Sequence, residues 1–305
     1  MEPVRTLEEL VDRAVVGGAR VVAVPAAESD TALAAVVEAR RRGIARGLLL
    51  GGREALVDRL WKLEEDPAHH EIVEEPDDAR AARRAVERIR AGEASLLLKG
   101  RLSTGDLLRA VLDRSQGLRT GRLLSDVMVS EHPTPSPPRI VGMSDGGVNV
   151  APGLAEKRAI LENAVRVFRR LGFERLVVAV VCAAEAPSEA MPHTLEARAL
   201  AEMADRGEIA GCEVVGPLAL DNALLPWAAR AKGIAHPLAG RADILLVPTI
   251  EAGNILGKAF SWLAGKPVAH VIEGARVPVL IPSRVERAGD KLLSIALGAL
   301  CTGEP

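Results

Sequence analysis

The chain has 305 residues, of which 48% are hydrophobic and 26% charged, as in an ordinary globular protein. Its formal net charge of -2 gives no bulk positive field for nucleic acid or an anionic membrane, so we expect neither as a partner. Aromatic residues make up 2% and Tyr is absent, so the core must be built from aliphatic side chains.

The sequence favours a cytoplasmic protein. Residues 1–10 carry acids and no apolar run, unlike a signal peptide, and apolar stretches such as 176–184 are too short to span a bilayer. The three cysteines form no CxxC pair, which favours reduced, buried thiols: Cys182, Cys212 and Cys301. No histidine shows metal-ligand spacing, so we expect no bound metal.

Strand-like and helix-like segments alternate along the chain. Apolar, β-branched runs predict strands at 20–24, 48–50, 96–99, 127–130, 140–143, 175–181, 213–215, 242–247, 266–272 and 279–281. Periodicity predicts helices at 29–42, 53–63, 79–91, 104–112, 156–171, 193–206, 222–232 (despite Pro226), 254–263 and 290–300. The proline-rich segment 131–139 predicts a loop or a domain crossing. Such alternation implies a mostly parallel sheet covered by helices, with ligands beyond the carboxyl ends of the strands.

Two polar loops of the central region follow predicted strands. In the first, Asp145-Gly-Gly-Val-Asn149, paired glycines allow a ligand to approach the backbone, and Asp145 and Asn149 can bond a substrate oxygen. The alternative is a tight turn whose side chains cap their own backbone. In the second loop, 216–222, Asp221 either caps the following helix or lines a cleft.

A third loop, 248–254, follows the strongest predicted strand. Gly253 and Asn254 there open a helix, whose free N–H groups and dipole favour an anion. No Walker motif and no GxGxxG motif is present, so dinucleotide binding has no direct support.

The segment 278–290 combines a hydroxyl, a guanidinium and two acids. Ser283 and Arg284 after a strand make an oxyanion binder, because Arg can bind phosphate bidentately. The alternative is an exposed capping Ser beside a solvated Arg. Glu286 and Asp290 are each either a general base or an acid near the start of the last helix.

A similar cap-plus-cation cluster lies at 99–109. The cluster contains Thr104 and Arg109, and Lys99 precedes both in the sequence. Solvated helix charges are the alternative interpretation.

Together these segments resemble the phosphate acetyltransferase and phosphate butyryltransferase family, most closely its butyryl branch. The resemblance runs from about Leu96 to the C-terminus, and residues 1–95 match only in their strand-helix outline. The motifs that carry it are KGRLSTGDLLRAVLD (99–113), DGGVNVAP (145–152), MADRGEIAG (203–211), GPLALDNA (216–223), ADILLVPTIEAGN (242–254) and PSR followed by KLLSIAL (282–297).

The resemblance implies a fold similar to that of isocitrate and isopropylmalate dehydrogenases. Two three-layer α/β/α domains with mostly parallel sheets would then enclose a cleft. The first domain would comprise residues 1–135 plus 282–305, and the second residues 136–281.

The resemblance also implies reversible transfer of a short acyl group, butyryl above all, between coenzyme A and inorganic phosphate. Coenzyme A would be a substrate, with no bound cofactor, and the protein a homo-oligomer. The thiol would attack the carbonyl of the acyl phosphate, aided by a carboxylate base and by cations that stabilise the oxyanion.

Site residues follow motif by motif. Ser283 and Arg284 match the catalytic pair of the family. Asp290 matches the thiol-activating acid of the acetyl branch, whereas butyryl-branch sequences often carry an acid at the position of Glu286; this chain has both, and we favour Asp290. Substrate-binding positions would be Arg109, Thr104, Asp145, Asn149, Asp221, Gly253 and Asn254.

Two other functions compete with this interpretation. A dehydrogenase of the related fold would need a nucleotide-binding loop and metal-binding aspartates, and neither is seen. The second alternative is a non-catalytic module that binds coenzyme A or regulates another protein. The presence of Ser283, Arg284 and Asp290 argues against this alternative.

Overall fold

The computed structural model describes residues 2–134 and 137–303, which form two compact units. The flanking unit comprises residues 7–122 and 268–303, and the middle unit comprises residues 2–6 and 123–267. The units change over after residues 122 and 267, and the domains that the resemblance implies change over after residues 135 and 281.

Strand pairing explains where these units divide. β5 (Ser125–Glu131) pairs antiparallel with β6 (Ile140–Ser144), so the proline-rich segment between them joins two strands of one sheet. Pro135 and Ser136 of that segment lie outside the described residues. After the second crossing, β11 (Val279–Leu280) pairs with β10 (Val268–Glu273) and with β4 (Leu96–Leu98), all in the flanking unit.

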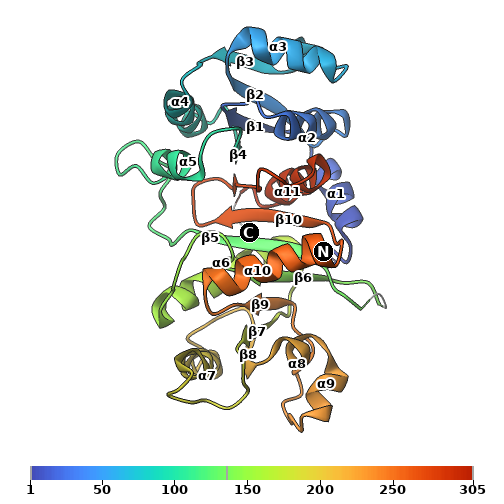
Figure 1. The fold of residues 1–305 in the computed structure, drawn as a ribbon, viewed down its shortest axis with the longest axis vertical. Helices are drawn as coiled ribbons and strands as arrows, with labels where there is room; N and C mark the ends of the chain where they lie inside the picture. The colour runs from blue at the N-terminus through green and yellow to red at the C-terminus, as the bar shows by residue number, and fades with distance from the viewer. Residues whose placement is uncertain (1, 135–136, 304–305) are drawn as a thin grey trace. The chain divides into compact units, whose positions relative to one another are not determined.

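The flanking unit carries a sheet of order β3-β2-β1-β4-β11-β10, parallel throughout except for the β11–β10 pair. Its other strands are β1 (Arg20–Pro25), β2 (Ala45–Gly51) and β3 (Glu71–Glu74). Its helices are α1 (Leu7–Val16), α2 (Asp30–Arg41), α3 (Arg53–Lys62), the short 3₁₀ turn η1 (Pro67–His69), α4 (Asp78–Arg90), α5 (Thr104–Val111) and α11 (Ala288–Leu300). In Figure 1, α4 lies beside α5, and α11 lies beside α1 and α2.

The middle unit has the strand order β5-β6-β9-β7-β8, in which only β5 and β6 run antiparallel. The remaining strands are β7 (Val177–Val181), β8 (Glu213–Leu218) and β9 (Ile244–Leu246). The helices are α6 (Leu154–Arg170), α7 (Pro192–Asp205), α8 (Leu220–Leu224), α9 (Pro226–Ala231) and α10 (Ile250–Lys258), which continues into the π-helical turn η2 (Ala259–Leu263).

The prediction of one helix over 222–232 is wrong in one respect, because the helix is interrupted before Pro226. Leu225 is extended, with φ -123° and ψ 110°, and it separates α8 from α9. Proline disfavours helical backbone in the residue before it, which accounts for the break.

Aliphatic side chains fill the core, as the composition predicts. Leu48, Leu49 and Leu50 of β2 and the three leucines of β4 are completely inaccessible to solvent. Such continuous apolar runs are typical of parallel strands covered on both faces. No helix among the described residues is long and apolar enough to cross a membrane.

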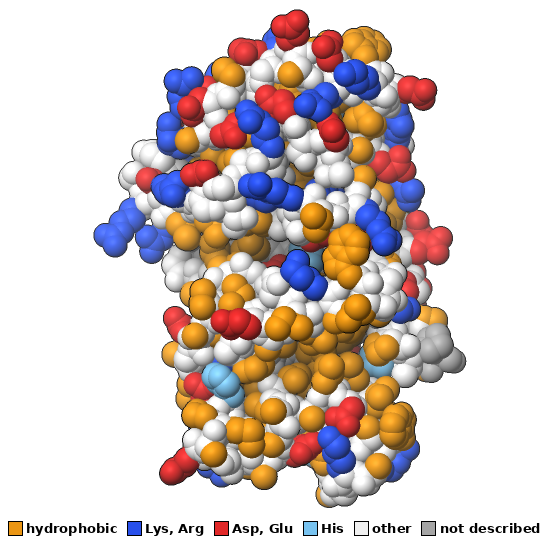
Figure 2. Space-filling model, in the orientation of Figure 1, with side chains coloured by type: hydrophobic (Ala, Val, Ile, Leu, Met, Phe, Trp, Pro, Cys, Tyr) orange, Lys and Arg blue, Asp and Glu red, His pale blue; other side chains and the backbone are white. Residues whose placement is uncertain are grey.

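Surface character differs along the chain. In Figure 2 the visible face of the flanking unit carries mostly Lys, Arg, Asp and Glu, whereas hydrophobic side chains gather on the visible face of the middle unit. Leu263, Ile255 and Trp262, on α10 and η2, are 87%, 69% and 53% exposed.

Candidate functional site

The catalytic candidates of the flanking unit lie where β4 and β11 end. These strands are parallel neighbours with Leu280 opposite Leu98, so the residues that follow them emerge at the same edge of the sheet. The main-chain N–H of Lys99 donates to the carbonyl of Leu280 at 2.9 Å, which ties the two strand ends together. Ser283 and Arg284 come shortly after β11, beyond Ile281 and Pro282.

A tight turn presents Ser283 and Arg284. The main-chain N–H of Ser283 donates to Oε1 of Glu286 at 2.8 Å, and the N–H of Glu286 donates to the carbonyl of Ser283 at 3.1 Å. The Arg284 side chain is exposed, and no hydrogen bond or ion pair holds its guanidinium within the part of the chain that the structure describes. This turn therefore leaves a guanidinium available to a ligand.

The two acids differ in how they are held. Glu286 uses Oε1 to brace the turn, while its Oε2 is buried and has no partner among the described residues. Asp290 lies near the start of α11, where its Oδ1 accepts from the main-chain N–H of Val268 at 3.2 Å. Each carboxylate therefore has a structural contact through one oxygen.

Two buried lysines lie beside the turn that carries Arg284. Neither was assigned to the site from the sequence. Lys99 is 5% exposed and Lys291 is 2% exposed. Burial lowers the pKa of Lys99, and the nearby Arg284 and Lys291 lower it further, against the effect of Glu286. Burial also lowers the pKa of Lys291. The available signals were a lysine ending the apolar run 96–98 and a lysine within the apolar helix α11.

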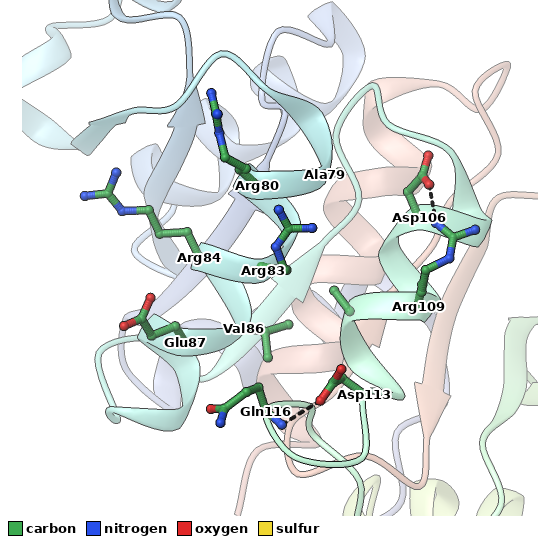
Figure 3. A pocket seen from close by; sticks show the side chains of 11 residues that line it. Ala79, Arg80, Arg83, Arg84, Val86, Glu87, Asp106, Arg109, Asp113 and Gln116 are labelled. Atoms are coloured by element: carbon green, nitrogen blue, oxygen red, sulfur yellow. Dashed lines mark hydrogen bonds and ion pairs between the residues drawn. The ribbon is translucent and has the colours of Figure 1, made fainter.

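Arg109 and Thr104 lie on α5, and Arg109 borders a groove between α4 and α5 of about 530 Å³ (Figure 3). Arg109 donates to Asp106 at 2.5 Å, and Asp106 in turn accepts from the hydroxyl of Ser103, the N-cap of α5. Thr104 is exposed at the first position of the helix.

Arginines from α4 line the opposite wall of this groove. Arg80 is paired with Glu75, and Arg84 donates to the carbonyl of Glu74. Arg83 has no hydrogen-bond partner within the described ranges, and Figure 3 shows it between Arg80 and the α5 wall. Acids also line the groove, namely Glu87, Asp106 and Asp113, so its walls carry four arginines against three carboxylates.

In the middle unit, Asp145 and Asn149 organise their own loop. Asp145 is 2% exposed, and its carboxylate accepts from the main-chain N–H groups of Gly147, Val148 and Asn149 at 2.8, 3.0 and 3.1 Å. The Asn149 amide donates to Asp145 and to the carbonyl of Leu124. Burial raises the pKa of Asp145, and Asp126 raises it further, despite the N–H donors. These contacts match the capping alternative for the loop.

Gly253 and Asn254 pack against the same loop. A Cβ on Gly253 would lie 2.6 Å from the carbonyl oxygen of Asp145, so the close approach of α10 requires glycine. Asn254 is exposed, and its amide donates to the carbonyl of Gly146 at 3.3 Å. The structure thus brings Asp145, Asn149, Gly253 and Asn254 together beyond the ends of β6 and β9.

Asp221 lies apart from that group. It follows β8, the outermost strand, which β7 separates from β9. Its carboxylate pairs with Lys232 at 3.1 Å, and the same lysine pairs with Glu185. The N-cap of α8 is Ala219, so Asp221 stands in the first turn and does not cap the helix.

Fold and site together define an α/β protein whose candidate site residues follow the carboxyl ends of strands. The family described as phosphate acetyl/butaryl transferase matches residues 52–299. The phosphate butyryltransferase of Clostridium acetobutylicum is 40% identical over 282 residues, 92% of this chain and 93% of its own. The phosphate acetyltransferase of Thermotoga maritima is 42% identical over 294 residues, 96% of this chain and 99% of its own. The chain therefore belongs to the phosphate acetyl/butyryl transferase family, as its motifs indicate.

Solved structures support the same assignment. A branched-chain phosphotransacylase from Enterococcus faecalis superposes with a TM-score of 0.82 at 28% identity, covering 93% of this chain and 100% of that one. A 4-hydroxythreonine-4-phosphate dehydrogenase from Klebsiella pneumoniae shares the fold, with a TM-score of 0.56 at 14% identity over 92% of this chain and 98% of that one. The predicted dehydrogenase-like α/β fold is thereby confirmed.

Proposed function

We propose that this protein transfers a short acyl group reversibly between coenzyme A and inorganic phosphate. The observation that carries the proposal is the turn at 283–286, which leaves the guanidinium of Arg284 available beside two buried lysines. Such a concentration of positive charge suits a phosphoryl group and a developing oxyanion. The names of the relatives, which include both butyryl and acetyl enzymes, support the same reaction.

The proposed mechanism is direct attack by the thiol. The sulfur of coenzyme A forms a bond to the carbonyl carbon of the acyl phosphate, and its proton passes to a carboxylate. The carbonyl oxygen gains negative charge, which Arg284 stabilises with a main-chain or Ser283 donor. The bond from carbon to the bridging oxygen then breaks, and its electron pair leaves with inorganic phosphate.

We propose Asp290 as the base that accepts the thiol proton. Supporting this choice, Glu286 already braces the catalytic turn through Oε1. Glu286 is the alternative base, because its Oε2 has no partner among the described residues. Neutral amide substitutions, which preserve the structural contacts of each carboxylate, distinguish the two candidates.

We propose that the groove between α4 and α5 binds the phosphorylated nucleotide end of coenzyme A. Its guanidinium groups suit phosphates, and Arg109 of α5 and Arg83 of α4 both line it. The N-terminus of α5, with the exposed Thr104, adds main-chain donors at one end. In the middle unit we propose Asn254 as the substrate contact, since its side chain is exposed. Asp145, Asn149 and Gly253 would then support the loop beside it, and Asp221 would contribute least.

We further propose a cytoplasmic homo-oligomer without bound cofactor. The exposed Leu263, Ile255 and Trp262 on α10 and η2 support association with a second copy. Light scattering during gel filtration tests this, with Leu263→Asp expected to shift the protein toward monomer.

The reaction is tested by phosphate-dependent release of thiol from acyl-CoA substrates of increasing chain length. We expect release with a maximum at a short acyl group, and butyryl-CoA is our choice. No release with any chain from acetyl to hexanoyl would favour a non-catalytic binding module. Reduction of NAD in the presence of a 2-hydroxy acid would instead favour the dehydrogenase alternative.

A further inference from the structure

Lys99 and Lys291 are buried without an acidic partner. Lysines are almost never fully buried unless they are paired, because removing the ammonium group from water is costly. The buried Lys157 of α6 obeys this rule, since it forms an ion pair with Glu196. No carboxylate lies within ion-pair distance of Lys99 or Lys291 in the described part of the chain.

The two ammonium groups are held only by main-chain carbonyls. Lys291 Nζ donates to the carbonyls of Ser283 and Glu286 at 2.9 and 3.0 Å. Lys99 Nζ contacts the carbonyls of Gly100 and Leu102, both at 3.3 Å. The contacts of Lys99 are long for an ammonium donor, whereas those of Lys291 are of ordinary length. The two lysines therefore differ in how firmly they are bound.

Charge in this cluster is unbalanced. Lys99, Arg284 and Lys291 supply three positive groups, against the two carboxylates of Glu286 and Asp290. Lys99 also follows β4 at the same sheet edge as the turn that carries Arg284. An anionic ligand at this edge would offset the positive charge and give Lys99 a charged acceptor in addition to its two long contacts with carbonyls.

We propose that Lys99 is a direct ligand of the phosphoryl group, together with Arg284, and that Lys291 is a positioning residue that clamps the turn 283–286. This rests on the proposed acyl transfer and deepens it, because it names the cations that bind inorganic phosphate and the phosphoryl end of the acyl phosphate. Lys291 acts through the turn and does not touch the substrate.

The decisive measurement is binding of inorganic phosphate, without acyl-CoA, by calorimetry and thermal shift. Lys99→Gln removes the charge and keeps a donor, and Lys99→Arg keeps the charge. We expect Lys99→Gln to weaken phosphate binding roughly ten- to a hundredfold, the range for a lost charge-assisted hydrogen bond, and Lys99→Arg to restore part of it. Lys62→Met, an exposed lysine of α3, is the matched control and should bind phosphate like the wild type.

Steady-state kinetics separate the two lysines. For Lys99→Gln, the KM for phosphate should rise while the KM for acyl-CoA stays within about threefold of the wild type. For Lys291→Met, kcat should fall with little change in phosphate affinity, and Lys291→Arg should recover part of the rate. Lys99→Met is a second neutral variant if Lys99→Gln does not fold.

Unchanged phosphate affinity in folded Lys99→Gln or Lys99→Met would overturn the proposal for Lys99. Equal weakening of phosphate and of 3′,5′-ADP, a probe for the nucleotide end of coenzyme A, would also overturn it. For Lys291, an unaltered kcat would overturn the positioning role. If the wild type binds phosphate but transfers no acyl group, the proposed function fails while the phosphate site stands.

Discussion

Lys291 Nζ donates to the main-chain carbonyl of Ser283, eight residues earlier in the chain, at 2.9 Å, and so links α11 to the preceding turn. The same ammonium holds the carbonyl of Glu286, so a single buried side chain fixes both ends of the segment that carries Arg284. Donors and charges that are held in place before the reaction stabilise the transition state without a cost of reorganisation. The proposed chemistry therefore depends on a side chain that holds the catalytic turn and does not itself touch the substrate.

The base can be identified with amide substitutions. Asp290→Asn and Glu286→Gln each keep an oxygen that accepts the existing main-chain bond, from Val268 and from Ser283, but neither can take a proton. We expect Asp290→Asn to lower kcat by about 10²–10⁴-fold, the range for general base catalysis, and Glu286→Gln to have a much smaller effect. The reverse order, measured by thiol release, would assign the base to Glu286.

Replacing an arginine of the groove between α4 and α5 should weaken the binding of coenzyme A selectively. Arg109→Ala and Arg83→Ala should each raise the KM for coenzyme A by about tenfold or more, because each removes a charge-assisted contact. The KM for phosphate should not change. Arg46→Ala, at an exposed position of β2, is the control. Equal effects on both substrates would show that the groove is not the nucleotide site.

Close packing at Gly253 predicts a loss of stability. In Gly253→Ala the new methyl group would meet the backbone of Asp145 and Gly146, which cannot move as a flexible side chain can. We expect the free energy of unfolding in urea to fall by about 1–3 kcal/mol. Gly289→Ala is the control, since its Cβ would meet nothing within 4 Å. Equal stability of the two variants would contradict the packing role.

His132 predicts a pH dependence of stability. Its Nε2 lies 2.7 Å from the guanidinium of Arg139, while its Nδ1 accepts from the main-chain N–H of Thr134 at 3.1 Å and lies 2.6 Å from the Thr134 hydroxyl. Burial, aided by Arg139, lowers the pKa of His132 to about 4. Because the folded pKa lies below the unfolded one, this contribution is present above about pH 6.5 and is lost as the pH falls toward 4.

The corresponding measurement is the free energy of unfolding between pH 7 and 4. His132 should contribute a slope of at most about 1.4 kcal/mol per pH unit, and His132→Asn should flatten it. His236→Asn, on an exposed ring of the same unit, should leave the slope unchanged. An identical slope in wild type and His132→Asn would refute the assignment.

The fold was predictable from sequence where local signals decide the structure. Apolar runs such as 96–98 and 244–246 formed buried strands, and the last helix began within two residues of its predicted start at Asp290. The proline-rich segment 131–139 was harder to interpret. Prolines predict an interruption of secondary structure, but they do not distinguish a crossing between domains from a connection between two paired strands. The pairing of β5 with β6 decides that question.

The candidate site was predictable only in part, for a related reason. Ser283, Arg284 and Asp290 stand close together in sequence, so a motif can reveal them. Lys99 and Lys291 join them through the pairing of β4 with β11 and through the bonds from α11 to the turn. Asp145 was predicted as a substrate ligand, but its carboxylate is occupied by N–H donors of its own loop. Such bonding depends on backbone geometry that a sequence pattern does not specify.

The central claim is tested most directly by the initial rate of phosphate-dependent thiol release from butyryl-CoA, compared between wild type and Arg284→Ala. We expect kcat to fall by about 10²–10³-fold, because a charge-assisted oxyanion contact is lost. The melting temperature should not change, since the Arg284 side chain is exposed. Arg46→Ala should retain the wild-type rate. A turnover of Arg284→Ala close to that of the wild type would contradict the account.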